Sequence, residues 1–204
     1  MFSLLFRKYK GVPLVPHVGV SAAIPHAFSL LVFVLLFLCL GKSILFAQAA
    51  KGAKENRTPY EEKPLLPSFN IRLLDSTTIF NTGKIVKGKP TVFILFSPDC
   101  DHCAQLAKEV KDSADALLST NLYMISPPMP LFEIKKFAFI NGIAHKSNIV
   151  VGQDINFFFG SFFHAETVPF VVLYDKNKKL VTVLKQLKKV EELLSELRKI
   201  SKAR

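Results

Sequence analysis

Two cysteines lie where a predicted buried strand gives way to a helix. Residues 91–96 (TVFILF) form a short, continuous run of β-forming residues, which is typical of a strand buried on both faces of a sheet. After a turn at residues 98–100 (PDC), apolar side chains recur at helical spacing over residues 101–118. Cys100 is therefore expected at or next to the N-cap of this helix, with Cys103 one turn inside it. The free N–H groups and the positive end of the helix dipole favour a thiolate at Cys100.

The spacing of Cys100-Asp-His-Cys103 lets the two sulfurs join in a small disulfide ring. A thiolate at Cys100 is an effective attacking group, Cys103 resolves the resulting mixed disulfide, and His102 adds positive charge or a hydrogen bond. Three other interpretations stay open. A zinc site needs two further ligands, and a purely structural disulfide gains little from so short a loop. A copper-delivery site would use both cysteines and a distant histidine, His164.

Strand-like and helix-like segments alternate along the chain and end in a hairpin. The expected strands are 91–96, 122–125, 149–151, 170–174 and 180–184, and the expected helices are 101–118, 131–140, 154–163 and 187–200. Residues 175–179 (DKNKK) join the last two strands. This order predicts an α/β fold with a central mixed β-sheet flanked by helices.

The N-terminal part of the chain has the pattern of an export signal. Residues 1–26 are a basic region, residues 27–50 are apolar apart from interruptions at Lys42 and Gln48, and Ala47-Gln48-Ala49 has the form of a cleavage site. Cleavage after Ala49 would release the domain. Without cleavage, residues 27–50 are close to the length of an inner-membrane anchor. Both outcomes predict a periplasmic or other extracytoplasmic location, where disulfides persist.

Residues 51–67 combine charged side chains with three prolines, which predicts an exposed linker before a folded domain over residues 68–204. The formal net charge is +11, and residues 176–204 alone hold ten basic groups against three acidic ones. No nucleic-acid motif accompanies them. We therefore interpret them as a solvated helix face and tail, and we expect no nucleic-acid partner.

Several motifs together resemble the thioredoxin-like superfamily, nearest to its exported TlpA-like or redoxin-type thiol–disulfide oxidoreductases. The matching segments are residues 66–69 (LPSF), 88–90 (GKP), 97–103 around the cysteines, Thr167-Val168-Pro169, and the 174–178 hairpin. The resemblance spans residues 65–200. The combination of Cys-x-x-Cys with Thr-Val-Pro before a strand is its most specific part.

The resemblance implies that the peptide bond between Val168 and Pro169 is cis and lies beside a Cys100–Cys103 disulfide. In this family the backbone at Thr167, Val168 and Pro169 binds an extended segment of a protein substrate. The implied partners are protein thiols and disulfides. The redox-active disulfide would serve in place of a cofactor, and no metal is expected.

The sequence departs from the family pattern around the cysteines. Asp99 stands where the family usually has tryptophan, and the chain contains no tryptophan. Acids that accept a proton in related proteins are replaced by Ile94 and Leu106. Glu109 and Glu166 are the nearest alternatives in the sequence, and we interpret both as surface charges.

Five phenylalanines between residues 157 and 163 exceed the needs of one buried helix face. They predict either a core helix or a hydrophobic groove near Pro169 that binds a partner. Taken together, these features predict a cell-envelope thiol–disulfide oxidoreductase. A copper metallochaperone and a non-catalytic thioredoxin-like binding module are the alternatives.

Overall fold

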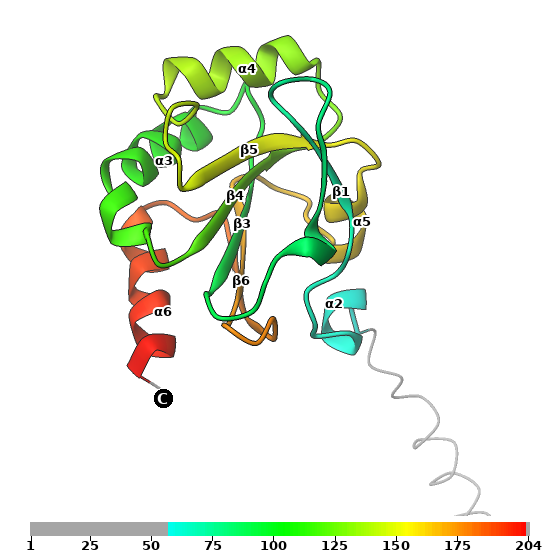
Figure 1. The fold of residues 1–204 in the computed structure, drawn as a ribbon, viewed down its shortest axis with the longest axis vertical. Coiled ribbons are helices and arrows are strands. Elements are labelled where there is room, and N and C mark those ends of the chain that lie inside the picture. Colours follow the sequence, from blue (N-terminus) through cyan, green and yellow to red (C-terminus); the bar gives the residue numbers. More distant parts are fainter. Residues whose placement is uncertain (1–56, 203–204) are drawn as a thin grey trace, which may run out of the picture. The chain divides into compact units, whose positions relative to one another are not determined.

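The computed structural model describes residues 57–202, which fold into a central β-sheet with helices on both faces (Figure 1). The strands are β1 (Asn70–Leu73), β2 (Ile79–Asn81), β3 (Thr91–Leu95), β4 (Asn121–Ser126), β5 (Ile149–Asp154), β6 (Phe170–Tyr174) and β7 (Leu180–Lys185). The α-helices are α2 (Pro59–Glu62), α3 (Asp101–Asp112), α4 (Leu131–Ile140), α5 (Phe158–Phe163) and α6 (Val190–Lys202). Two short 3-10 helices cover Thr82–Lys84 and Ala114–Leu117.

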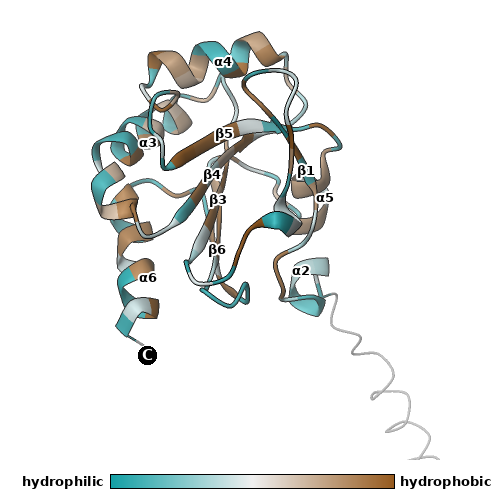
Figure 2. Cartoon of the chain, viewed as in Figure 1, coloured by the Kyte–Doolittle hydropathy of each residue, from teal (hydrophilic) through white to brown (hydrophobic). Residues whose placement is uncertain are grey.

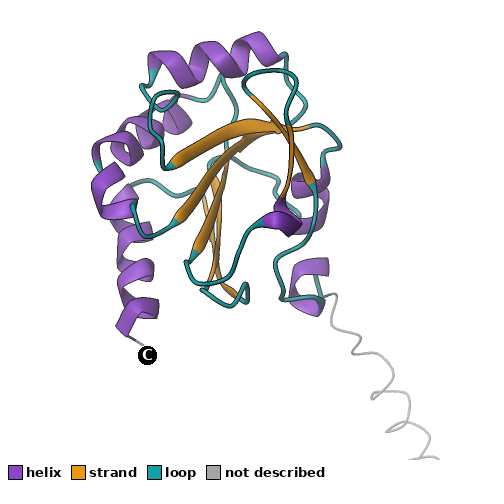
Figure 3. Cartoon of the chain, viewed as in Figure 1, coloured by secondary structure: helices purple, strands orange, loops and turns teal. Residues whose placement is uncertain are grey.

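The seven strands form one sheet in the order β2-β1-β5-β4-β3-β6-β7. Figure 3 shows the strands in orange, with the helices in purple around them. β3, β4 and β5 are parallel to one another, whereas β1, β2, β6 and β7 pair in antiparallel fashion. Helical crossovers join the parallel strands, as such connections require. The predicted α/β fold with a mixed sheet flanked by helices is confirmed.

The central strand β3 is buried on both faces, as its continuous apolar sequence predicts. Val92 and Ile94 point into one core together with α3, α4 and α6. Phe93 and Leu95 point into a second core, which holds α5 and Tyr60 from α2. The hydropathy colours show the brown, apolar strands enclosed between these helical layers (Figure 2). Burial on both sides makes β3 a rigid support for the segment that follows it.

The predicted helix over residues 101–118 is shorter in the structure. α3 ends at Asp112, Ser113 leaves the helical conformation with φ −94° and ψ 11°, and a 3-10 helix follows. Ala114 and Leu117 are nevertheless buried. These two apolar residues led to the longer helix in the prediction. They reach the core from a tighter 3-10 turn rather than from a continuous α-helix.

The resemblance likened residues 66–69 to an entry strand, but the first strand is β1, at Asn70–Leu73, and its partner β2 was not predicted. The edge that they form changes the neighbouring elements. β5 continues beyond the predicted 149–151 to Asp154, because its last three residues pair with β1. Gly152 permits this close approach: a Cβ there would lie 2.6 Å from the carbonyl oxygen of Arg72. The following helix consequently begins at Phe158 rather than near residue 154.

Residues 57–67 were predicted as part of an exposed linker, but they pack on the domain. Tyr60 is 9% exposed, and its ring centroid lies 5.6 Å from that of Phe163. The Leu66 N–H donates to the carbonyl of Lys178 at 2.9 Å, and the Leu180 N–H donates to that of Pro64 at 2.7 Å. The apolar ring of Tyr60 and these backbone bonds extend the folded domain toward the N-terminus from Ser68.

The predicted basic region (1–26), the signal sequence or anchor (27–50) and the first part of the linker (51–56) lie outside the described residues. Within residues 57–202, no helix combines the length and the apolar character needed to cross a membrane.

Candidate active site

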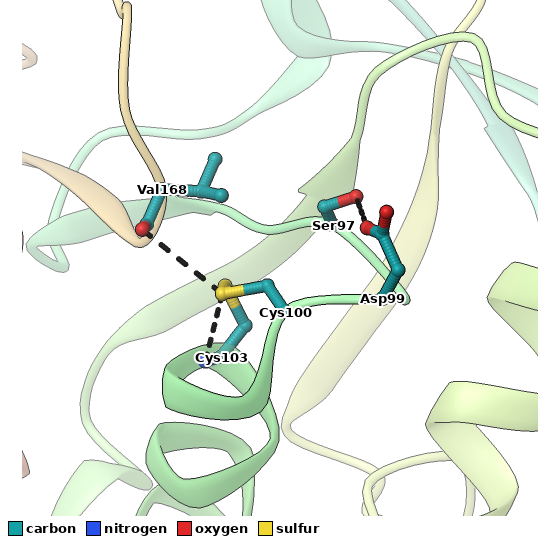
Figure 4. Close-up of a disulfide and its surroundings, with 5 residues drawn as sticks. All are labelled: Ser97, Asp99, Cys100, Cys103 and Val168. Atoms are coloured by element: carbon teal, nitrogen blue, oxygen red, sulfur yellow. Dashed lines mark hydrogen bonds between the residues drawn. A yellow bond between two sulfur atoms is a disulfide. The ribbon is translucent and has the colours of Figure 1, made fainter.

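The two cysteines form a disulfide at the N-terminus of α3 (Figure 4). Cys100 is the N-cap residue, with extended backbone angles of φ −99° and ψ 112°, and its Sγ accepts a hydrogen bond from the Cys103 N–H at 3.1 Å. The Cα atoms are 5.2 Å apart. A sulfur at an N-cap takes the place of the usual oxygen acceptor, and the same N–H and helix dipole stabilise negative charge there.

Burial distinguishes the two sulfurs. Cys103 is 1% exposed and belongs to the core beneath α3, whereas Cys100 is half-buried at the edge of that core. An attacking thiolate needs access to the sulfur that it strikes. The geometry therefore makes Cys100 the sulfur that an external thiol can reach.

The segment before β6 lies beside the disulfide. The peptide bond between Val168 and Pro169 is cis, as the resemblance implied, and the Val168 carbonyl oxygen lies 4.0 Å from Cys100 Sγ. The pairing of β3 with β6 explains why the two segments are close. The strands are antiparallel, and Leu95 pairs with Phe170. The chain leaving β3 toward Cys100 and the chain entering β6 through Pro169 therefore share one end of the sheet.

The three residues of the Thr-Val-Pro segment differ in exposure. Pro169 is buried, Val168 is half-buried, and Thr167 is exposed. A backbone that is supported on one side and open on the other is suited to pairing with an extended chain.

The polar neighbours of Cys100 point away from the sulfurs or into solvent. Asp99 is exposed and accepts a hydrogen bond from the Ser97 hydroxyl, on the side away from the disulfide (Figure 4). An inward-facing Asp99 would have opposed a Cys100 thiolate, and this orientation removes that conflict. His102 is exposed on the first turn of α3.

Ile94 and Leu106 occupy the two positions at which the family pattern has an acidic side chain. Both residues are fully buried in the core. Glu109 accepts a hydrogen bond from the Val190 N–H at 2.9 Å, so it serves the first turn of α6. Glu166 is exposed. Neither glutamate is seen in contact with a sulfur.

One buried polar atom near this end of the sheet was missed by the sequence analysis. The Ser126 hydroxyl, at the end of β4, is fully buried and has no hydrogen-bond partner among the described residues. Strand alternation places it on the same face as Met124, in the core that contains Cys103. The sequence signal was weak, because a serine before Pro127 is ordinary in a turn.

The metal hypothesis gains no support from the described part of the chain. Residues 57–202 contain no group of three or more His, Cys, Asp or Glu side chains arranged to hold a metal ion. His164, the expected third copper ligand, is exposed in a left-handed conformation at the end of α5.

The five phenylalanines of α5 and its N-cap residue differ in burial. Phe159 and Phe163 are fully buried, Phe158 and Phe162 are half-buried with their rings stacked 5.2 Å apart, and Phe157 is 47% exposed. The core-helix interpretation accounts for most of this cluster.

The similarity of this chain to known proteins is found in its structure and not by the sequence comparisons. No family model and no curated protein matches the sequence. A secreted disulfide oxidoreductase from Mycobacterium tuberculosis, homologous to E. coli DsbE, matches with a TM-score of 0.55 at 17% identity, covering 64% of this chain and 95% of that one. StoA from Bacillus subtilis matches with a TM-score of 0.52 at 14% identity, covering 65% and 98%.

A thioredoxin-like protein from Porphyromonas gingivalis also matches, with a TM-score of 0.55 at 22% identity, covering 67% of this chain and 92% of that one. The domain has the thioredoxin-like fold. In this thioredoxin-like domain, the Cys-x-x-Cys pair at a helix N-terminus and the cis proline before an antiparallel strand meet at one end of the sheet.

Proposed function

We propose that this chain is an exported, TlpA-like thiol–disulfide oxidoreductase that exchanges disulfides with protein substrates through Cys100-Asp-His-Cys103. The observation that carries the proposal is the asymmetric disulfide. Cys100 is half-buried at a helix N-terminus, it is bonded to the buried Cys103, and its Sγ lies 4.0 Å from the carbonyl oxygen of Val168. A disulfide that only stabilised the fold would not need a partly exposed cysteine beside the partly exposed Thr167-Val168-Pro169 segment.

In the reducing direction, the Cys100 thiolate attacks a substrate disulfide. A Cys100–substrate disulfide forms and one substrate thiolate leaves. Cys103 then loses its proton and attacks Cys100 Sγ, which releases the second substrate thiolate and closes the Cys100–Cys103 disulfide. In the oxidising direction the same steps run backward, and a substrate dithiol is oxidised as the protein disulfide is reduced. No organic cofactor or metal enters either direction.

Substrate binding is assigned to Thr167, Val168 and Pro169. The half-buried backbone of Val168 beside Cys100 offers hydrogen-bonding groups to an extended substrate segment, which would present its sulfur to Cys100.

The test is disulfide exchange by the full chain in detergent, followed as reduction of insulin by dithiothreitol. Cys100→Ser should lower the rate to background. Cys103→Ser should accumulate a mixed disulfide at Cys100, visible as a mass increase that a reductant removes. Cys39→Ser is the matched control and should behave as the wild type. Undiminished activity of Cys100→Ser would overturn the proposal.

The direction of electron flow follows from the reduction potential of the pair. A value near roughly −270 mV marks a reductant and one near roughly −120 mV marks an oxidant, by comparison with characterised dithiol proteins. If no Cys100–Cys103 disulfide forms in any redox buffer tested, disulfide exchange by this pair would be contradicted.

The extracytoplasmic location rests on the pattern of residues 1–50 and is tested separately. In spheroplasts that express the Cys39→Ser chain, a membrane-impermeant thiol reagent should label Cys100 after mild reduction. Labelling only after lysis would place the domain in the cytoplasm.

A further inference from the structure

Six lysines gather at the end of the sheet opposite the disulfide. The loop over residues 83–90 carries Lys84, Lys87 and Lys89, and the β6–β7 turn over residues 175–179 carries Lys176, Lys178 and Lys179. The only acid in these two loops is Asp175, whose carboxylate accepts the backbone N–H groups of Asn177 and Lys179 at 2.8 Å each. We call residues 83–90 and 175–179 the lysine end; its formal charge is +5.

Backbone and side-chain bonds join the two loops into one surface. The Gly88 N–H donates to the carbonyl of Lys176 at 2.9 Å, and Lys178 Nζ donates to the carbonyl of Gly83 at 3.3 Å. Among residues 57–202, none of the six lysines forms a salt bridge. Their charge is therefore not neutralised by salt bridges within the described domain, and a cluster of like charges creates a positive potential that attracts anions.

Apolar groups accompany the lysines. Val86, between Lys84 and Lys87, is 77% exposed. A cavity of about 780 Å³ opens beside Lys89 and Lys176, and the helix α6 lines its wall with Leu194, Leu197, Ile200 and the cationic Arg198. Cations around exposed apolar groups match the interface of a bilayer, where phosphates lie above acyl chains.

The polypeptide enters the domain at the same end. Pro64 and Leu66 pair with the β6–β7 turn through the backbone bonds to Leu180 and Lys178, and α2 lies beside this turn in Figure 1. The apolar run of the sequence ends at Ala50, so residues 51–56 are all that separate it from the described domain. Such a segment spans at most about 25 Å when fully extended.

We propose that the lysine end docks on the headgroups of anionic phospholipids. β3 leads from this end toward Cys100, so docking holds the disulfide on the side of the domain that faces away from the bilayer. This inference rests on the proposed extracytoplasmic location and on the alternative in which residues 27–50 stay as an uncleaved anchor, but it does not depend on the exchange chemistry.

Val86→Trp tests the docking directly, because the chain has no other tryptophan. The full chain is reconstituted into vesicles of brominated phosphatidylcholine and phosphatidylglycerol at about three to one, or of brominated phosphatidylcholine alone. Bromine quenches a tryptophan that enters the interface. We expect quenching and a blue shift in the anionic vesicles only, with both effects lost in about 0.5 M salt, where exposed charges are screened.

Two variants serve as controls. Phe132→Trp places the probe on α4, at the other end of the domain, where the native side chain is 68% exposed (Figure 1). It should stay unquenched in both vesicle types. Adding Lys84→Glu, Lys87→Glu and Lys176→Glu to Val86→Trp should abolish the lipid-dependent quenching while leaving the circular dichroism spectrum unchanged.

Equal quenching of Val86→Trp in both vesicle types would show that the tether alone holds the domain at the surface, and would overturn the proposal. So would quenching of Phe132→Trp to the same extent, which would show that the lysine end is not the part of the domain that faces the bilayer. The Cys100→Ser/Cys103→Ser chain should still dock, so docking and exchange can fail independently.

Discussion

Cys100 and Cys103 share one disulfide but have different surroundings, and the roles that we propose for them rest on this difference. The N-cap position gives Cys100 an N–H donor, while burial at 1% exposure shields Cys103 from external thiols. His102 lies between them, exposed on the first helical turn. We therefore expect His102 to act on Cys100 through charge or a hydrogen bond rather than through packing.

His102→Ala should make the pair less oxidising. Positive charge or a hydrogen bond from His102 would stabilise the Cys100 thiolate. Stabilising the reduced form raises the reduction potential, so removing His102 should lower the potential. Gln105→Ala, exposed one turn further along α3, is the control and should leave the potential unchanged.

The sequence analysis interpreted Glu109 as a surface charge, whereas in the structure its carboxylate caps the first turn of α6. Its carboxylate receives the Val190 N–H at 2.9 Å. Glu109→Ala should lower the free energy of unfolding by about 1 kcal/mol, as the loss of a helix cap does, and Glu109→Gln should lower it less. Urea unfolding measures both, with exposed Lys108→Ala as control. A changed pH profile of disulfide exchange in Glu109→Gln would instead indicate proton transfer.

At the scale of the element, α5 depends on a carboxylate from the preceding strand. Asp154 is 1% exposed, and its Oδ2 accepts the Phe159 N–H at 2.6 Å. Asp154→Ala should destabilise the domain by about 1–3 kcal/mol, because a buried donor loses its partner. Hydrogen exchange at Phe159 should accelerate along with the drop in urea stability. Asp112→Ala, in an exposed ion pair with Lys111, should cost almost nothing.

The β1–β2 turn should carry a pH dependence of its own. Hydrogen bonds from Thr78, first from its side chain and then from its backbone, hold the pKa of Asp75 below its ordinary value of 3.8. The stability that these bonds add is present above pH 3.8 and is lost as the pH falls through the lower pKa of the folded state. The stability difference between wild type and Asp75→Asn should therefore shrink in acid. A constant difference between pH 6 and pH 2 would contradict this.

At the scale of the whole molecule, Tyr60 joins the N-terminal segment to the domain. Its ring packs against Phe163 on the face of the sheet that α5 covers. Tyr60→Ala should lower the free energy of unfolding by roughly 2–4 kcal/mol, the range for deleting a large buried side chain. It should also speed hydrogen exchange at the Leu66 amide, which bonds to Lys178. Tyr60→Phe keeps the ring and should stay near the wild type. Unchanged exchange at Leu66 in Tyr60→Ala would show that the segment is held by its backbone bonds alone.

The parts of the fold that could be predicted from sequence are those encoded locally. The apolar run of β3 and the helical spacing after Cys100 placed the cysteines at a helix N-terminus, because strand burial and helix amphipathicity leave periodic patterns. The cis proline came from the Thr167-Val168-Pro169 motif and its family resemblance. The β1–β2 edge and the packing of residues 57–67 left no such pattern, since short, half-exposed segments have few apolar residues to repeat.

The two cysteines at a helix N-terminus, the order of strands and helices, and the basic excess toward the C-terminus can all be read from the amino-acid sequence. The folded domain was needed to show which cysteine is the more exposed, that Glu109 serves α6, that Asp99 turns away, and that lysines about ninety positions apart form one surface. Periodicity and capping are local properties of a chain, whereas exposure and charge clustering depend on strand pairing that joins distant residues.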